Sequence, residues 1–311
     1  MSGGQTIVAQ IGIILSGGIR IMIPIAFGAL GCTLSERVGV INIGAEGIML
    51  AGAFGAVVGS YYTGNAWIGV LFGLLSGVLL ASVHAFLTVK LKTGQIISGL
   101  GVNMLASGVT TVLLQSIWNN RGKSDLVTGL QNIRIKGVEN IPIIGAVLRS
   151  ISPMLIILLI VAIVLWFWLY KTVPGLRARS IGENPRSPDS VGINVPRTQI
   201  LCVIVSGAIT AFGGIYLSIG DVSLFSRDMV AGRGFIALAV TILGGWKPAG
   251  VLGACLAFGI AQGMQFRLQE FSVPVQLVQM LPYVMTLLLM FFLRSSHGPA
   301  ASGENFHREG E

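Results

Sequence analysis

Long apolar runs dominate the chain, and short polar connections separate them. A helix that crosses a bilayer needs about 20 mainly apolar residues, and most of the runs reach that length. Several are short or are broken by glycine. The pattern predicts an all-α polytopic integral membrane protein with about eight to ten transmembrane helices, some of them broken or re-entrant. The apolar segments lie near 7–33, 38–60, 66–89, 94–118, 153–170, 199–218, 234–246, 249–266 and 275–293.

Composition supports a membrane protein. Hydrophobic residues make up 53% of the chain and charged residues only 10%, whereas a soluble domain carries about 25% charged residues. The net charge is +8, but the basic residues are scattered through the connections between apolar runs. They therefore indicate orientation in a membrane rather than a nucleic-acid surface. We expect membrane lipid as a partner and no nucleic acid.

The polar connections define the expected organisation. Residues 1–293 should form the transmembrane domain, and the polar tail 294–311 should be disordered. If the connection 171–198 is cytoplasmic, the positive-inside rule is satisfied, although weakly. That side of the membrane then also receives Arg37, Lys90, Lys92, Lys247 and Arg294.

The polar insert GLRARSIGENPRSPDSVGINVPR, residues 175–197, interrupts the apolar pattern. Ser187 is a good N-cap, Pro188 suits the first helical position, and Asp189 falls in the first turn, where the helix dipole favours an acid. Gly192 is a natural stop, and residues 182–185 favour a turn. The insert therefore predicts a helix of about one to two turns at the membrane surface. It is either a plain loop or a docking element for a soluble partner.

The same insert resembles the cytoplasmic coupling loop of the permease family that serves ABC importers of branched-chain amino acids, ribose and nucleosides. Two further stretches are similar to segments of that family, namely RVGVINIGAEGIMLAGAFGAVVG (37–59) and GRGFIALAVTILGGWKPAGVLGACLAFG (232–259). The motif Ile-Asn-Ile-Gly-Ala-Glu-Gly most resembles the sequences of the family's nucleoside branch. The family's usual Ala-Ala pair is Ser187-Pro188 here, while the matching positions in the loop are Gly175, Arg179, Gly182, Asn184, Gly192 and Ile193.

The resemblance implies a permease subunit in the plasma (inner) membrane of a prokaryote. Its partners would be a second, related permease subunit, a cytoplasmic ABC ATPase that binds ATP and Mg, and an extracytoplasmic substrate-binding lipoprotein. The chain has no G-x-x-x-x-G-K-[ST] motif, so we expect no ATP site, no cofactor and no enzymatic activity in it. The substrate would be a nucleoside, or alternatively a ribose-like sugar or a branched-chain amino acid. Coupling to the ATPase would fall to Arg179, Gly182, Glu183, Asn184, Ser187, Pro188, Asp189 and Gly192.

Polar residues inside apolar runs are the candidates for the transport path. An intramembrane carboxylate is costly, so Glu46 should face the protein interior or a wet cavity. Asn42 lies one helical turn before it. Either both line the path, or Glu46 holds a broken segment through backbone hydrogen bonds or a pair with Arg20. Gln95, Ser98 and Asn103 could bind a neutral polar substrate or bond between helices.

Two further groups complete the candidates. His84 stands alone in an apolar run without a second metal ligand nearby, so no metal site is expected. The stretch 219–234 should face outward, where Asp221, Arg227 and Asp228 could dock the binding lipoprotein or belong to a plain solvated loop.

Other classes remain open on the residues alone. A secondary transporter driven by an ion gradient also uses broken helices, but it would not need a docking helix and usually carries several intramembrane ionisable groups. A channel would need a filter-like motif, and an intramembrane enzyme would need a nucleophile or metal arrangement such as H-E-x-x-H. Neither motif is present in the sequence.

Overall fold

The computed structural model describes residues 2–133, 151–268, 280, 284 and 298–306. Within these ranges the chain forms helices joined by short connections. Two of the long helices end in a π-helical turn, labelled η. The elements in chain order are α1 (Ser2–Glu36), α2 (Ala45–Thr63), α3 (Ala66–Ala85), η1 (Phe86–Lys90), α4 (Gln95–Trp118), α6 (Pro153–Lys171), α7 (Val173–Glu183), α8 (Arg186–Ser190), α9 (Val195–Ile215), η2 (Tyr216–Val222), α10 (Arg233–Leu243) and α11 (Pro248–Leu268).

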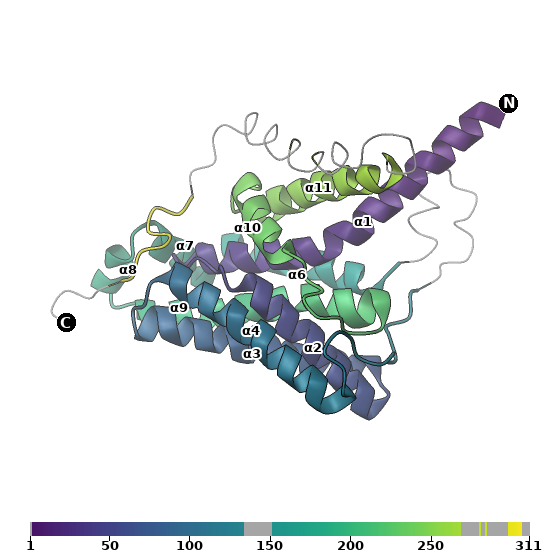
Figure 1. Ribbon diagram of the computed structural model, residues 1–311. Coiled ribbons are helices and arrows are strands. Elements are labelled where there is room, and N and C mark those ends of the chain that lie inside the picture. The colour runs from purple at the N-terminus through teal and green to yellow at the C-terminus, as the bar shows by residue number, and fades with distance from the viewer. Residues whose placement is uncertain (1, 134–150, 269–279, 281–283, 285–297, 307–311) are drawn as a thin grey trace.

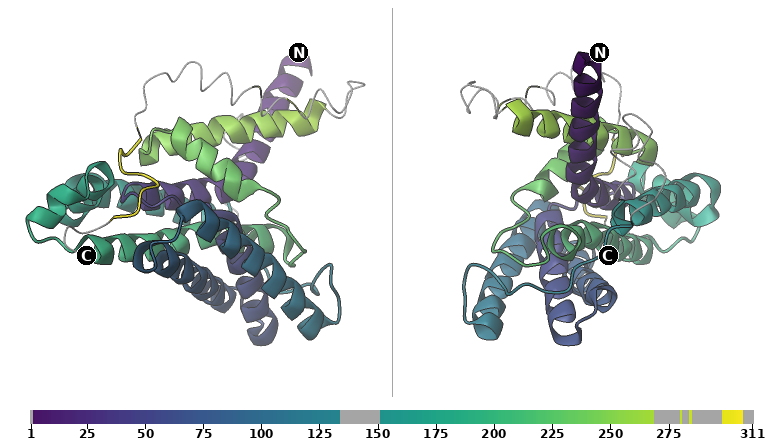
Figure 2. Two further views of the ribbon diagram at one scale, coloured as in Figure 1. Left: turned by 60° about the vertical axis from the view of Figure 1, so that its left-hand side comes forward. Right: turned by 90° about the vertical axis from the view of Figure 1, so that its right-hand side faces the viewer.

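The long helices form a single bundle in which α9 is central. Helices α2, α3 and α9 pack against one another, α4 covers α2, and α1 runs along α9 on the other side. Helix α11 lies beside α1, with α10 leading into it, as Figures 1 and 2 show. Helices α7 and α8 project together at one end of the bundle, at the left of Figure 1.

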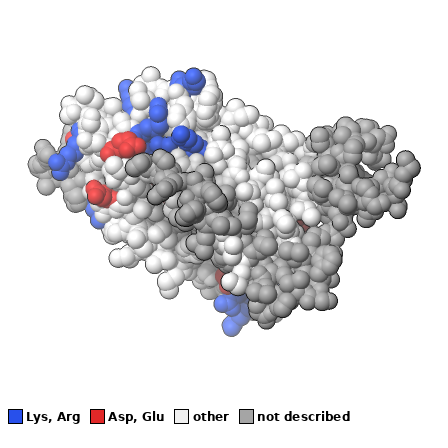
Figure 3. Space-filling view, turned by 90° about the horizontal axis from the view of Figure 1, so that it is seen from above, with Lys and Arg blue, Asp and Glu red and all other residues white. Residues whose placement is uncertain are grey.

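Five of the described helical segments are long and apolar enough to cross a membrane. Most of the charged side chains visible in Figure 3 gather at the end of the molecule where α7 and α8 lie, and the white surface next to them is uncharged. The membrane normal therefore runs along the bundle, with α7 and α8 outside the bilayer. The five segments are Ile14–Glu36, Ala66–Lys90, Gln95–Trp118, Pro153–Lys171 and Val195–Val222.

Most of the predicted apolar segments correspond to observed helices. The main correction concerns 38–60, because residues 37–44 are irregular and α2 starts only at Ala45. The segment 234–246 forms a helix of only 11 residues, α10, which is too short to span a bilayer. The predicted segment 275–293 lies outside the described residues apart from 280 and 284.

Glycine allows the central helices to approach closely. A side chain at Gly214 of α9 would collide with the backbone carbonyl of Met49 in α2, and one at Gly207 would collide with Ala81 in α3. Small residues at crossing points are typical of membrane helices, where van der Waals contact replaces the hydrophobic effect as the driving force. The high glycine content is therefore used in packing.

Candidate coupling surface and translocation path

The polar insert forms two helices rather than one. Helix α7 starts after Thr172, whose hydroxyl accepts a hydrogen bond from the Gly175 backbone N–H (3.2 Å). Helix α8 starts at Arg186, because the Asn184 side-chain oxygen accepts from the Arg186 N–H (3.1 Å). The predicted N-cap at Ser187 is therefore wrong, as that residue lies inside α8.

The predicted turn and stop have mixed outcomes. Residues 182 and 183 belong to α7, so the predicted turn is restricted to Asn184 and Pro185. Gly192 has φ +81° and follows the end of α8, which confirms the predicted stop because glycine adopts this left-handed conformation without strain.

The predicted coupling residues divide into an exposed and a buried set. Val191, at the end of α8, is an apolar side chain with 74% of its surface exposed. Gly182 and Pro188 are buried, and Arg179 and Asp189 are half-buried. The exposed set can meet a partner, whereas the buried set attaches α7 and α8 to the bundle. The exposed predicted residues are Glu183, Asn184, Ser187 and Gly192. Together with their exposed neighbours Ser190 and Val191 they form a surface that we call the docking face.

Arg37 joins the α7–α8 unit to the bundle. A Cβ atom at Gly182 would collide with the Arg37 carbonyl, so α7 packs directly on the residue that follows α1. The Arg37 Nε donates to the carbonyl oxygen of Trp246 (3.0 Å), in the turn between α10 and α11. The Arg179 guanidinium lies 4.9 Å from the centre of the Tyr170 ring in α6. Movement of α7 would therefore be transmitted to α1, α6 and α10.

The C-terminal tail also contacts this region. Disorder was expected for it, which is wrong for residues 298–306. The Ala301 N–H donates to the Gly182 carbonyl (2.9 Å), and the Gly303 N–H donates to that of Gly39 (3.1 Å). The tail borders a cavity of about 390 Å³ that also contains Lys90, Lys92 and Arg197 in its wall. Three of the basic residues assigned to one side of the membrane, Arg37, Lys90 and Lys92, therefore lie at the α7–α8 end, whereas Arg294 lies outside the described residues.

The irregular connection between α1 and α2, residues 37–44, is held by side chains from several helices. Non-helical backbone within a membrane protein is tolerated only where protein or water satisfies its polar groups. Ser35 Oγ donates to the Val40 carbonyl (2.6 Å), and Gln199 Nε2 from α9 donates to that of Val38 (3.0 Å). Side chains of α1 and α9 thus satisfy backbone carbonyl groups of the connection.

Gln95, at the start of α4, binds the same connection. Its side-chain oxygen accepts from the Ile41 N–H (2.7 Å), and its amide nitrogen donates to the Gly39 carbonyl (3.3 Å). His84 of α3 lies 3.3 Å from the Ile41 carbonyl and 3.0 Å from the Ser98 hydroxyl. Ser98 therefore contacts the connection indirectly, through the ring of His84, and both side chains are buried.

Two further predicted path residues, Asn103 and Asn42, lie at the same connection. Asn103 accepts from the Gly47 N–H (2.7 Å) and donates to the Ile43 carbonyl (3.0 Å), joining α4 to the first turn of α2. The fully buried Asn42 donates to the Ser206 hydroxyl (3.4 Å), while its side-chain oxygen has no partner among the described residues. The structure thus brings Asn42, Gln95, Ser98 and Asn103, four of the five predicted path residues, to the α1–α2 connection.

Replacing Asn103 by leucine should destabilise this connection. The change leaves one backbone N–H and one carbonyl without partners, each worth about 1–3 kcal/mol when buried. The melting temperature of the purified transporter should fall by about 5 °C. Gln115→Leu on the same helix is the matched control, because within the described ranges that side chain bonds to Asn119 at the helix end and to no backbone group of another helix. Equal melting temperatures for the two variants would contradict the holding role.

Glu46 holds the start of α10. Its two carboxylate oxygens accept from the backbone N–H groups of Gly232 and Gly234, both at 2.7 Å. Of the alternatives that the sequence left open, the structure shows the backbone hydrogen bonds. The suggested pair with Arg20 is not formed, because Arg20 contacts Asp221 at 3.4 Å.

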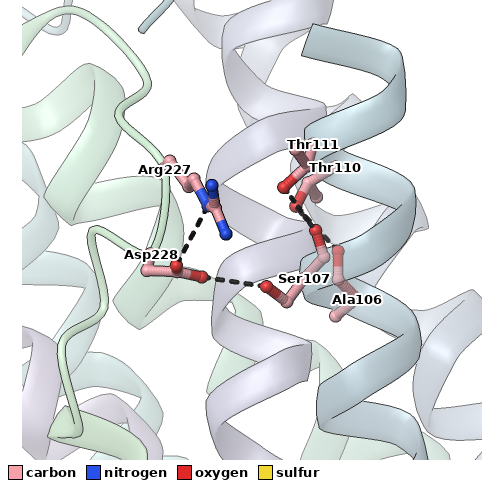
Figure 4. A network of polar contacts seen from close by, with 6 residues as sticks. All are labelled: Ala106, Ser107, Thr110, Thr111, Arg227 and Asp228. Atoms are coloured by element: carbon pink, nitrogen blue, oxygen red, sulfur yellow. Dashed lines mark hydrogen bonds and ion pairs between the residues drawn. The ribbon is translucent and has the colours of Figure 1, made fainter. Parts of the chain in front are cut away.

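The stretch before α10 does not lie on the outer surface throughout. Its first part pairs with the connection after α4, where the Ser124 N–H donates to the Phe225 carbonyl (2.9 Å). Further along, Asp228 accepts from the Ser107 hydroxyl in the middle of α4 (3.0 Å) and contacts Arg227 at 3.4 Å (Figure 4). Residues 223–243 therefore run along α4 as a segment of consecutive turns followed by the short helix α10.

Sequence reasoning missed three features of this region. Helix α7 carries a visible signal, since Thr172 and Pro174 are an N-cap and an early helical proline. The role of Arg37 depends on a contact to Trp246, 209 positions away, and has no local signal. The bond between Ser107 and Asp228 likewise spans 121 positions.

Taken together, these elements indicate the class of membrane protein to which the chain belongs. Several helices cross the membrane, a helical unit projects on one side, and two irregular segments inside the bundle are held by buried polar side chains. Such interruptions mark membrane transporters, in which non-helical backbone lines the route of the substrate. The α7–α8 unit adds a surface for a soluble partner.

The chain belongs to the branched-chain amino acid transport system / permease component family, which matches residues 14–291. It is a multi-pass permease subunit of an ABC transporter in the inner membrane of a prokaryote. Members of this family are transport subunits rather than enzymes. The membership decides against the gradient-driven transporter, the channel and the intramembrane enzyme.

Relatives with assigned roles cover almost the whole chain. The nucleoside ABC transporter permease protein NupC of Lactococcus lactis is 34% identical, over 97% of this chain and 99% of that protein. The guanosine ABC transporter permease protein NupQ of Bacillus subtilis is 34% identical, over 96% of this chain and 97% of that protein. Each organism has a second relative, NupB (25% identical, over 72% of this chain and 62% of that protein) and NupP (25%, 77% and 69%).

Proposed function

We propose that this chain is one of two permease subunits of an ATP-driven importer of nucleosides. The observation that carries the proposal is the 34% identity, over nearly the full length, to permeases of nucleoside and guanosine transporters. The occurrence of NupC with NupB and of NupQ with NupP supports a second, non-identical permease as the partner.

The docking face would bind a cytoplasmic ATPase that forms a separate chain and uses ATP and Mg. Its residues are exposed, and the α7–α8 unit that carries them packs on Arg37. Closure of the ATPases would then move α7 against the end of α1 and the α10–α11 turn. The basic side chains around this unit support its cytoplasmic placement.

The transport path would pass the two irregular segments. Asn42, Gln95, Ser98 and Asn103 would serve it through the α1–α2 connection, which we propose as the inner gate. Glu46 would serve it through the start of α10, which its carboxylate holds. At the other end of the bundle, a substrate-binding lipoprotein would deliver the substrate to the surface that carries Asp221.

Uptake by the assembled transporter tests the substrate class. Cells that express this chain with its permease partner, the ATPase and the binding lipoprotein are given labelled guanosine, adenosine, uridine, ribose or leucine. We expect nucleoside uptake at least about tenfold above cells that lack this chain, and no such increase for ribose or leucine. Uptake of ribose or leucine alone would refute the nucleoside assignment and leave the permease role intact.

A further inference from the structure

A charged group lies in the middle of the membrane domain. Helix α4 has 24 residues, so it is about 36 Å long, and Ser107 lies about 18 Å from its start. The hydrocarbon core of a bilayer is about 30 Å thick, which places Ser107 close to the midplane. Asp228 accepts a hydrogen bond from this serine, and Arg227 is paired with Asp228 (Figure 4).

This group is not buried within the chain. The side chains of Arg227 and Asp228 are 57% and 58% exposed. Charged side chains at the bilayer centre are costly in contact with lipid and almost always face a protein interior or a water-filled cavity. The surface that carries them must therefore face a polar space in the assembled transporter.

The adjoining side of α4 fits such a space. At 100° per residue, Ser107, Gly108, Thr111 and Gln115 share one side of the helix, while Val109 lies about 160° away from Thr111. A Cβ atom at Gly108 would meet nothing within 4 Å. The polar side is thus open in its outer half, and apolar side chains occupy the side turned away from it.

The backbone around Asp228 is held in uncommon conformations. Asp228 has φ +53° and Ala231 has φ +50°, values that are uncommon for residues other than glycine. Two anchors hold the segment, because the Arg227 N–H donates to the Gly122 carbonyl (2.9 Å) and Glu46 binds Gly232. Strained backbone that is fixed from both sides is characteristic of functional sites.

We propose that Ser107, Arg227 and Asp228 form a substrate-contact site in the translocation path, for a neutral ligand with vicinal hydroxyl groups. The inference rests on the proposed function, and the ribose ring of a nucleoside is the matching chemistry. A carboxylate accepts from sugar hydroxyls, and a guanidinium donates to sugar oxygens. The two charges cancel, which favours a neutral ligand over an ionic one.

Maximal uptake rates test the ligand chemistry. The binding lipoprotein sets the affinity from outside, so a site within the membrane should change the maximal rate instead. Asp228→Asn keeps the size of the side chain and tolerates the left-handed backbone. We expect its maximal rate for guanosine to fall about tenfold, with the half-saturating concentration unchanged, and the ratio of guanosine to 2′-deoxyguanosine rates to fall to about one. Asp125→Asn, in the exposed connection after α4, is the matched control.

Equal loss for both nucleosides in Asp228→Asn, or no loss, would overturn the ligand assignment. A second measurement is independent of the substrate. Ser107→Cys and Val109→Cys are compared in the assembled transporter for reaction with a water-soluble methanethiosulfonate reagent; the native Cys32, Cys202 and Cys255 are buried. We expect Ser107→Cys to react at least about tenfold faster, and equal or reversed rates would refute a polar path at this position. A wild type that moves no nucleoside would refute the proposed function, and the labelling would still decide the location of the path.

Discussion

Replacing Gly182 by valine should abolish uptake while the ATPase stays bound. A Cβ atom at this position already collides with the carbonyl of Arg37, and valine adds two methyl groups. Helix α7 must then move away from the end of α1, which separates the docking face from the bundle. Because the docking face itself is unchanged, ATP hydrolysis should continue without transport.

The measurement is uptake and ATPase activity in the same membrane preparation, with the amount of this chain determined in parallel. Uptake per ATP hydrolysed should fall at least about tenfold in Gly182→Val, with Gly182→Ala between valine and wild type. Gly253→Val in α11 is the matched control, because a Cβ atom there meets nothing within 4 Å. Normal uptake per ATP in the Gly182→Val variant would show that α7 does not transmit force at this contact.

Replacing Glu46 by alanine should have the second large effect. The variant leaves the N–H groups of Gly232 and Gly234 without their carboxylate acceptor. Hydrogen bonds to a charged group are worth about 1.5–3 kcal/mol each, so the start of α10 should lose its position. We expect transport to fall about 100-fold at constant amount of protein in the membrane, as measured by guanosine uptake.

The glutamine variant separates the two roles considered for Glu46. Its amide oxygen can still accept a hydrogen bond, but it carries no charge. A holding role predicts intermediate transport for Glu46→Gln, between wild type and alanine. Transport as low as that of Glu46→Ala would instead make the charge itself essential. Gly234→Ala should resemble Glu46→Ala, because its Cβ would lie 2.5 Å from the Glu46 backbone nitrogen.

The sequence predicted the helices well because lipid imposes a minimum length and polarity on each span. It also identified Glu46, Asn103 and Gln95, since polar groups in apolar runs are rare enough to be noticed. Their partners could not be predicted, because they are backbone groups of distant segments. The Asp228 side chain shows the limit most clearly. Its charge suggested an outer loop, whereas its hydrogen bond to Ser107 puts it beside the middle of α4.

In the coupling loop, the exposure of the predicted residues could not be derived from the sequence. Its residues were recognised from their pattern, but the pattern did not separate Ser187, which is exposed, from Pro188, which is buried beside it. That distinction depends on how α7 and α8 pack on the bundle. The start of α8 was missed because the Asx turn at Asn184 and the N-cap at Ser187 are both compatible with the local sequence.

The hydrogen bonds of Glu46 have a consequence for biogenesis. Their partners, Gly232 and Gly234, lie 186 and 188 positions later in the chain. A nascent protein enters the membrane from its N-terminal side. The Glu46 carboxylate of α2 therefore arrives without its two backbone N–H donors, which follow only with the start of α10. The first half of the protein is therefore an incomplete folding unit during insertion, and the arrival of α10 is the step that completes it.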